Sequence, residues 1–252
     1  MDGRAQPEVV APRSAGGRAA GSPATSRADM AWEFLRRDPA YQSAWRRVTG
    51  RAHDPGRWTQ GEPNWGLVFP VDPHLGAASA GVFWSGDAAP AVVVEVEPCL
   101  TVCGRSLDLS ALPWSQRGEG AVTHMRAPGG LQVRILTRDL HQPLAAVAPL
   151  GVDFEIRLRT LARLHRALRD RPPGAEFTAQ QLRRLQLALQ AIDGRSGGLS
   201  QREIATDLFG RAAMAREPWK CSSLRETTQR LVRLGERLRR GGYRSLLLTR
   251  PR

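Results

Sequence analysis

Two stretches near the C-terminus, LSQREIATDLFG (residues 199–210) and SLRETTQRLVRLGERLRRGG (residues 223–242), decide how this part of the chain folds. In the first, Ser200 and Glu203 have the spacing of a capping box, so a helix is expected to begin there. Gly210 is placed to end that helix in a left-handed cap. Twelve residues separate Gly210 from the second stretch.

The second stretch predicts a helix with one apolar face and one charged face. It is expected to begin at Ser223 with Glu226 as capping-box partner and to end at Gly241-Gly242. At about 100° per residue, its leucines fall within roughly 80° of one another: Leu224, Leu231, Leu234 and Leu238. The opposite face carries Arg225, Gln229, Arg233, Glu236, Arg237 and Arg240.

A charged helix face is most often a solvated surface, but the setting of this helix favours a polyanion as its partner. Residues 153–252 hold 22 Lys or Arg against 10 Asp or Glu, whereas residues 1–152 hold 15 against 14. The net charge of +13 therefore belongs almost wholly to the last hundred residues. Recognition helices read DNA bases from their N-terminal turns, and this helix has Arg and Gln there. We therefore expect this region to bind DNA.

The composition indicates a protein of the reducing cytoplasm. The chain has only three cysteines, Cys99, Cys103 and Cys221, and begins with no secretory signal. No run approaches 18 apolar residues, so no membrane span is expected. Of the 37 basic side chains 36 are arginine, which suits phosphate and guanine contacts but equally reflects a GC-rich genome.

The N-terminal part is expected to open with a disordered extension and two short helices. Residues 1–29 are rich in Gly, Pro and Ala and have no apolar period. Residues 31–48 have helical spacing, with Asp29 as a cap and a corner at Pro39. The aromatic side chains of this segment are expected to pack in a core rather than to stack on bases.

Short apolar segments separated by Gly, Pro and Asp predict a small, mostly antiparallel sheet in the middle of the chain. The expected strands lie within residues 65–73, 81–84, 91–96, 121–125, 131–136 and 143–147. Val133 and Ile135 alternate with Gln132 and Arg134, which indicates one dry and one wet face. Such a domain suits interaction or scaffolding.

Helical spacing returns in the last hundred residues. A helix is expected over residues 153–169, and another begins at Thr178 with Gln181 as capping-box partner. Four helices are expected to close one core here. The fold class is α+β: N-terminal short helices, a small sheet, then an all-α domain of helix-turn-helix type. The expected units are a disordered extension (1–29), a helical module (30–76), a β-rich domain (77–150) and a helical DNA-binding domain (153–252).

No pattern supports catalysis or a cofactor. Cys99 and Cys103 could form half of a zinc site, but no second pair lies at finger spacing, so buried thiols are the better interpretation. Glu95 and Glu97 share a strand face, which more often is solvated than catalytic. No nucleotide-binding or hydrolase motif is present. We therefore expect neither an enzyme nor a bound metal.

The C-terminal signature SQREIATDLFG, with Trp219, the SLR at residues 223–225, the arginine-rich helix and GGYRSLL, resembles the RovC-like DNA-binding domain of proteobacterial transcriptional activators. WEFLRRDPAYQSAWR, WGLVFPVDP and VFW resemble the module that precedes this domain in FseA-like regulators of mobile elements. The resemblance covers roughly residues 30–248. It implies a cytoplasmic, oligomeric activator of secretion or conjugative-transfer promoters, which contacts DNA through the helix from Ser223 onward.

Within that helix and its surroundings, the residues expected to contact double-stranded promoter DNA are Arg202, Lys220, Ser222, Ser223, Arg225, Gln229, Arg230 and Arg233. Arg225 and Gln229 suit base edges, and the others suit phosphate. A homo-oligomer is expected, with RNA polymerase as a further partner of the remaining domains. Two alternatives stay open, an anti-activator or adaptor that binds a protein through the same helices and a nucleic-acid-processing enzyme.

Overall fold

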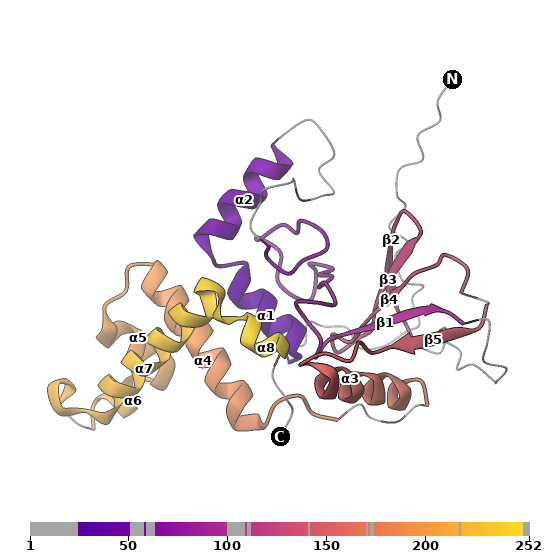
Figure 1. The fold of residues 1–252 in the computed structure, drawn as a ribbon. Coiled ribbons are helices and arrows are strands. Elements are labelled where there is room, and N and C mark those ends of the chain that lie inside the picture. The colour runs from indigo at the N-terminus through magenta and orange to yellow at the C-terminus, as the bar shows by residue number, and fades with distance from the viewer. Residues whose placement is uncertain are drawn as a thin grey trace.

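The computed structural model describes residues 25–50, 58, 64–99, 109, 112–140, 142–169, 171, 174–216 and 218–248 (Figure 1). Two short helices come first, a five-stranded sheet follows, and the C-terminal part is helical, so the expected α+β class is confirmed. The strands are β1 (Val93–Pro98), β2 (Ser115–Glu119), β3 (Val122–Arg126), β4 (Gln132–Ile135) and β5 (Leu144–Val147). The helices are α1 (Arg27–Leu35), α2 (Pro39–Thr49), α3 (Phe154–Ala167), α4 (Ala179–Ser196), α5 (Gln201–Phe209), α6 (Arg211–Met214), α7 (Ser223–Arg237) and α8 (Arg244–Leu248).

The first two helices meet at the proline corner that the sequence predicts. Asp38 caps α2, and Pro39 takes its first turn, where no backbone N–H is needed. The expected cap of α1 is wrong: Ser26 caps it by accepting from the N–H of Asp29 at 3.1 Å. The Asp29 carboxylate is instead paired with Arg126 of β3, so it ties the helix to the sheet.

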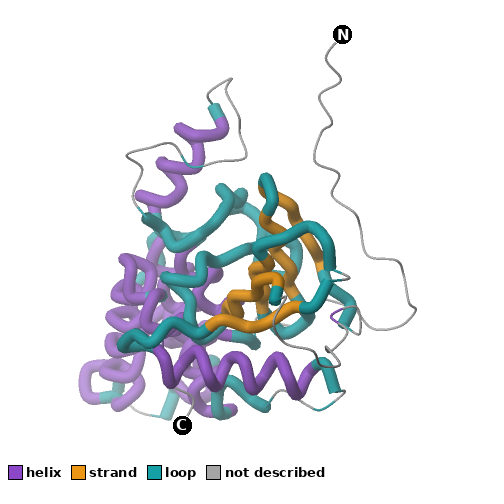
Figure 2. The backbone as a smooth tube through the Cα atoms, turned by 45° about the vertical axis from the view of Figure 1, so that its right-hand side comes forward, coloured by secondary structure: helices purple, strands orange, loops and turns teal. Residues whose placement is uncertain are grey.

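The sheet has the order β2-β3-β4-β1-β5, and every neighbouring pair is antiparallel except β1 and β4. Val133 and Ile135 are buried and Arg134 is partly exposed, as the alternation predicts, but the expectation is wrong for Gln132. Gln132 is buried because its side-chain amide donates to Val82 O and accepts from the N–H of Trp84. Helix α3 runs along the buried face and adds Leu164 to the apolar cluster of the sheet (Figures 1 and 2). The sheet and α3 therefore share one core.

Two of the expected strands are wrong, and one strand was missed. Residues 65–73 and 81–84 are irregular and share a single bridge, between Leu67 and Trp84. Prolines in the first segment have no N–H for a ladder, so its apolar side chains are buried without forming a strand. Strand β2 has almost no apolar residues, so an apolar pattern cannot reveal it.

A second core unites the N-terminal helices with the C-terminal ones. Helices α1 and α2 and residues 65–93 pack in the same cluster as α4, α5, α7 and α8 (Figure 1). The expectation that all four long C-terminal helices share a core is wrong for α3, which packs on the sheet. The apolar stripe of a helix indicates that the helix packs against another element, but it does not show which element that is.

Several expectations fall outside the described residues. Residues 1–24 and Cys103 are among them, whereas Arg27, Ala28 and Asp29, expected to be disordered, form the first turn of α1. Cys99 is half-buried and Cys221 is exposed. Within the described ranges, no helix combines the length and apolarity needed to cross a bilayer. The domain boundaries drawn from the sequence stay a prediction.

Candidate nucleic-acid interface

Helix α7 has the two faces that its sequence predicts. Leu231 and Leu238 of the leucine stripe are buried, and Thr228 and Gly235 join them on that side. The opposite face is solvent-exposed at Arg225, Gln229, Arg233, Arg237 and Arg240. The helix therefore packs through one side and presents arginine on the other.

The cap of α7 differs from the expected one. Ser222, not Ser223, is the N-cap, and its hydroxyl accepts a 3.1 Å hydrogen bond from the N–H of Leu224. Ser222 is 5% exposed, so its hydroxyl serves the helix end rather than the surface. Glu226 does not complete a capping box and instead lies 3.7 Å from Arg230, with both side chains exposed.

Close contact between α7 and α4 fixes the position of the exposed face. A Cβ at Gly235 would lie 2.4 Å from Ile192 Cγ2 and 2.7 Å from the carbonyl oxygen of Ala188. Only glycine permits this approach, because any side chain would overlap the backbone of α4. The close approach leaves the arginine face of α7 on the outside.

Helix α5 supports the N-terminal turn of α7. Its capping box is confirmed: Ser200 Oγ accepts from the N–H of Glu203 at 3.3 Å, and the Glu203 carboxylate accepts from the N–H of Ser200 at 2.8 Å. Hydrogen bonding of the Glu203 carboxylate to the side chain and to the backbone N–H of Ser200 lowers the pKa of Glu203. Gln201 donates a 3.1 Å hydrogen bond to the carbonyl oxygen of Arg225. Gly210 ends α5 with a φ of 83° and an extended ψ of 155°, not a left-handed helical turn.

The C-terminal end of α7 is anchored in the N-terminal module. After Leu238 the chain turns at Gly241, whose φ is +96°, a value that favours glycine. The buried Tyr243 follows, and its hydroxyl donates a 2.8 Å hydrogen bond to the carbonyl oxygen of Trp65. Helix α7 is thus held at its start, its middle and its end.

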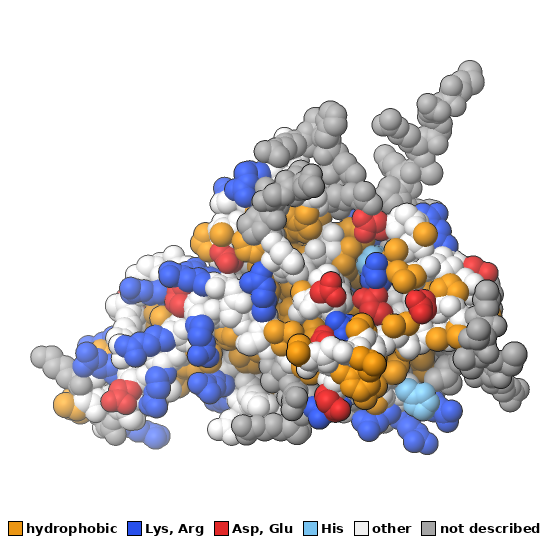
Figure 3. Space-filling model, in the orientation of Figure 1, with side chains coloured by type: hydrophobic (Ala, Val, Ile, Leu, Met, Phe, Trp, Pro, Cys, Tyr) orange, Lys and Arg blue, Asp and Glu red, His pale blue; other side chains and the backbone are white. Residues whose placement is uncertain are grey.

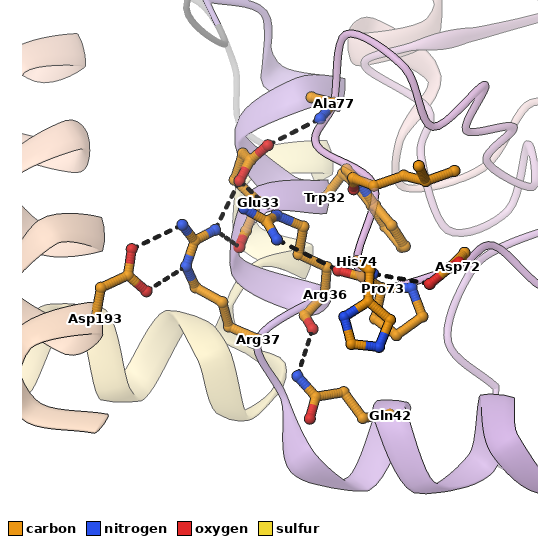
Figure 4. A network of polar contacts seen from close by, with 11 residues as sticks. Trp32, Glu33, Arg36, Arg37, Gln42, Asp72, Pro73, His74, Ala77 and Asp193 are labelled. Atoms are coloured by element: carbon orange, nitrogen blue, oxygen red, sulfur yellow. Dashed lines mark hydrogen bonds and ion pairs between the residues drawn. The ribbon is translucent and has the colours of Figure 1, made fainter. Parts of the chain in front are cut away.

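A polar network also links α4 to α1 (Figure 4). The guanidinium of Arg37 donates to both carboxylate oxygens of Asp193 in α4, at 2.6 and 2.8 Å, and to Glu33 at 2.6 Å. Burial works to raise the pKa of Glu33, but hydrogen bonds from Ala77 N–H, Arg37 and Arg36 outweigh it and lower that pKa. Arg37 therefore bridges the N-terminal helices and the helix that carries α7.

Most of the residues predicted to contact DNA lie on this exposed side. Arg202 on α5 and five positions on α7 are exposed or partly so: Ser223, Arg225, Gln229, Arg230 and Arg233. The Gln201–Arg225 hydrogen bond brings the start of α5, where Arg202 lies, beside the start of α7. Lys220 belongs to the 3-10 turn Trp219–Cys221, but its side chain lies outside the described atoms.

The basic surface extends beyond the residues that the sequence singled out. Figure 3 shows Lys and Arg spread over α4, α5, α6 and α7, with few acidic side chains among them. Arg211 and Arg216, in the connection between α5 and α7, are exposed and were not named. The basic residues of this twelve-residue connection were the available signal in the sequence, but helical spacing does not reveal them because the connection lies outside α5 and α7.

An amphipathic arginine helix packed on other helices is an arrangement that DNA-binding proteins use. The family comparisons define the class further. Residues 147–248 match the family described as "T6SS, Transcription factor, DNA binding domain", and residues 15–70 match the "Proteobacterial transcriptional regulator-like domain". The chain is therefore a DNA-binding transcriptional regulator, and the resemblance found in its sequence is confirmed. No curated protein matches it.

Proposed function

We propose that this regulator activates transcription and reads promoter DNA by placing α7 in the major groove. The observation that carries the proposal is the exposed stripe Arg225, Gln229 and Arg233, opposite the face that packs on α4. Helix α7 has 15 residues and is therefore about 22 Å long, and the stripe spans about 12 Å of that length. A helix with its side chains is about 10–12 Å across, which fits the major groove, about 12 Å wide.

The side chains of the stripe suit different parts of the duplex. Arg225 lies in the first turn and can donate two hydrogen bonds to guanine O6 and N7, and Gln229 can pair with adenine N6 and N7. Phosphate contacts are assigned to Arg202, Lys220, Ser223, Arg230 and Arg233. Ser222 acts through its cap: its hydroxyl accepts from the N–H of Leu224 and so orients the first turn of α7, which carries Ser223 and Arg225.

The remaining parts of the proposal concern partners and targets. One helix in one groove gives a weak contact, so a homo-oligomer that repeats it along the promoter would gain affinity. The N-terminal helices and the sheet are then the surfaces for self-association or for RNA polymerase. The targets are secretion or mobile-element transfer genes, consistent with the T6SS description of the C-terminal family, and the protein acts in the cytoplasm.

A genome-wide DNA pull-down tests this proposal. Wild type is compared with an Arg225→Ala/Gln229→Ala variant, and with Arg46→Ala on the exposed face of α2 as control. Discrete promoter peaks that vanish only in the double variant support sequence-specific reading by α7. Peaks that persist in the double variant, or a protein partner recovered in place of DNA, contradict it and favour the adaptor.

A further inference from the structure

A cavity of about 290 Å³ lies where three parts of the chain meet. One wall is α3, another is residues 174–176 just before α4, and Arg27 at the start of α1 closes the third side. Its apolar surface comes from Ala91, Ile156 and Ala162. The volume is at the lower end of the range for ligand pockets, so it suits a small molecule and not a polymer.

Arginines dominate the charge of this cavity. Arg159, Arg163 and Arg166 line it from α3, and their i, i+4 and i+7 spacing places them on one face of that helix. With Arg27 they bring four guanidinium groups to the cavity, against one carboxylate among the described lining residues, that of Glu176.

Glu176 is already engaged by two of the four arginines. It pairs with Arg163, and it accepts from the backbone N–H of Arg27, whose guanidinium donates to the Glu176 carbonyl oxygen at 3.0 Å. Burial lowers the pKa of the Arg27 guanidinium, Glu176 opposes this, and Arg163 lowers it further. One carboxylate therefore does not balance the positive charge of this site.

Unused hydrogen-bonding capacity remains among the described residues. The buried Nε of Arg163 has no hydrogen-bond partner. Within the described part of the chain, the one ion pair of Arg159 is a 3.9 Å contact with the exposed Glu155. Arg166 is exposed at the rim and makes no ion pair with a described residue. Guanidinium groups bind phosphate and carboxylate in a bidentate manner, and three of them line the α3 side of this cavity.

We propose that this cavity binds a small organic anion, with its phosphate or carboxylate groups on Arg159, Arg163 and Arg166 and its body against the apolar wall. The occupant is a metabolite-sized molecule, because the site is a recess between elements and not a continuous outer surface. A bound anion would join α3 to the segment that leads into α4. The ligand would thus connect the sheet core to the core that carries the DNA-binding helices.

Isothermal titration of the full chain with inorganic pyrophosphate and with citrate, at constant ionic strength, tests the site. The test variant is Arg159→Ala/Arg166→Ala, since both side chains are exposed and their loss leaves the core intact. Arg169→Ala/Arg171→Ala removes the same charge from exposed positions outside the cavity lining. We expect at least one anion to bind wild type, about tenfold weaker binding by the test variant, and little change in the control.

Three results would overturn the proposal. Equal losses in both double variants would show general charge attraction rather than a site. If wild type bound neither anion, the cavity would not be a binding site for small anions. If the test variant lost affinity for duplex DNA but kept its anion binding, Arg159 and Arg166 would belong to the DNA-binding surface. Circular dichroism serves as the control that every variant is folded.

Discussion

The side-chain amide of Gln201, at the start of α5, donates a 3.1 Å hydrogen bond to the backbone carbonyl of Arg225 in the first turn of α7. This bond sets the turn that carries Arg225 against α5. Gln201→Ala should therefore lower DNA affinity several-fold while costing only about 0.5 kcal/mol of stability, because the bond is exposed. Fluorescence anisotropy with promoter DNA and chemical denaturation measure the two effects. Gln180→Ala, at an exposed position of α4, should change neither.

Gly235 should be intolerant of any side chain. Gly235→Ala improves helix propensity by about 1 kcal/mol, yet its Cβ would overlap Ala188 O and Ile192, so a net destabilisation of about 1–2 kcal/mol is expected. DNA affinity should fall with it, because α7 must move away from α4. Thermal unfolding checks the sign. Glu226→Ala on the exposed face of the same helix provides the comparison, and equal stability of the two variants would show that the contact is not tight.

The contact between Arg37 and Asp193 should couple the N-terminal helices to α4. A double-mutant cycle with Arg37→Gln and Asp193→Asn is expected to give a coupling energy of about 0.5–1 kcal/mol. The value is modest because the Asp193 side chain is 52% exposed, so water screens the pair. Urea unfolding of the four proteins measures it. A coupling energy of zero would mean that the shared core alone joins the two parts.

His124 should make the fold sensitive to acid. Burial, with Arg134 and Arg117 nearby, lowers the pKa of His124 to about 4, and its ring lies against Phe69 and Phe83. Above pH 6.5 the residue is neutral in both the folded and the unfolded state. As the pH falls from about 6.5 to about 4, only the unfolded state gains a proton, so the free energy of unfolding falls by up to about 3 kcal/mol.

His124→Phe tests this linkage, since a phenyl ring can take the same place between the two phenylalanines. Its stability should change less with pH than that of wild type across this window, as measured by urea unfolding at a series of pH values. The exposed His74, replaced by Ala, should leave the wild-type profile in place. An unchanged profile in His124→Phe would assign the acid sensitivity to other groups.

The helices could be predicted well from the sequence because their signals are local. The capping boxes of α4 and α5, the proline corner at Pro39 and the two faces of α7 all follow from spacing within a few residues. The cap of α1 could not be predicted, because Asp29 is drawn to Arg126, almost a hundred residues away. Strand β2 was hidden for a related reason: its pairing with β3 stabilises it, not its own apolar content.

The functional surface was only partly accessible to sequence reasoning. The periodicity of α7 indicates its arginine face, but nothing in the local sequence shows that Ser222 is buried, so the sequence places it among the DNA contacts. Gly235 carries no polar group or charge, so its importance emerges only when α4 lies against it. The cavity lined by arginines brings together Arg27, α3 and Glu176. These residues are too far apart in the sequence for any motif to include them.

The salt dependence of promoter binding tests the central claim most directly. If α7 and its neighbours neutralise about five phosphates, log affinity should fall with log salt concentration at a slope near −4.5. Arg233→Ala should reduce the slope by about one unit on every sequence, whereas Arg225→Ala should relax base preference by about 1–3 kcal/mol. Arg46→Ala, on α2, should preserve the slope. A wild-type slope near zero, or equal slopes in all variants, would contradict DNA reading by α7.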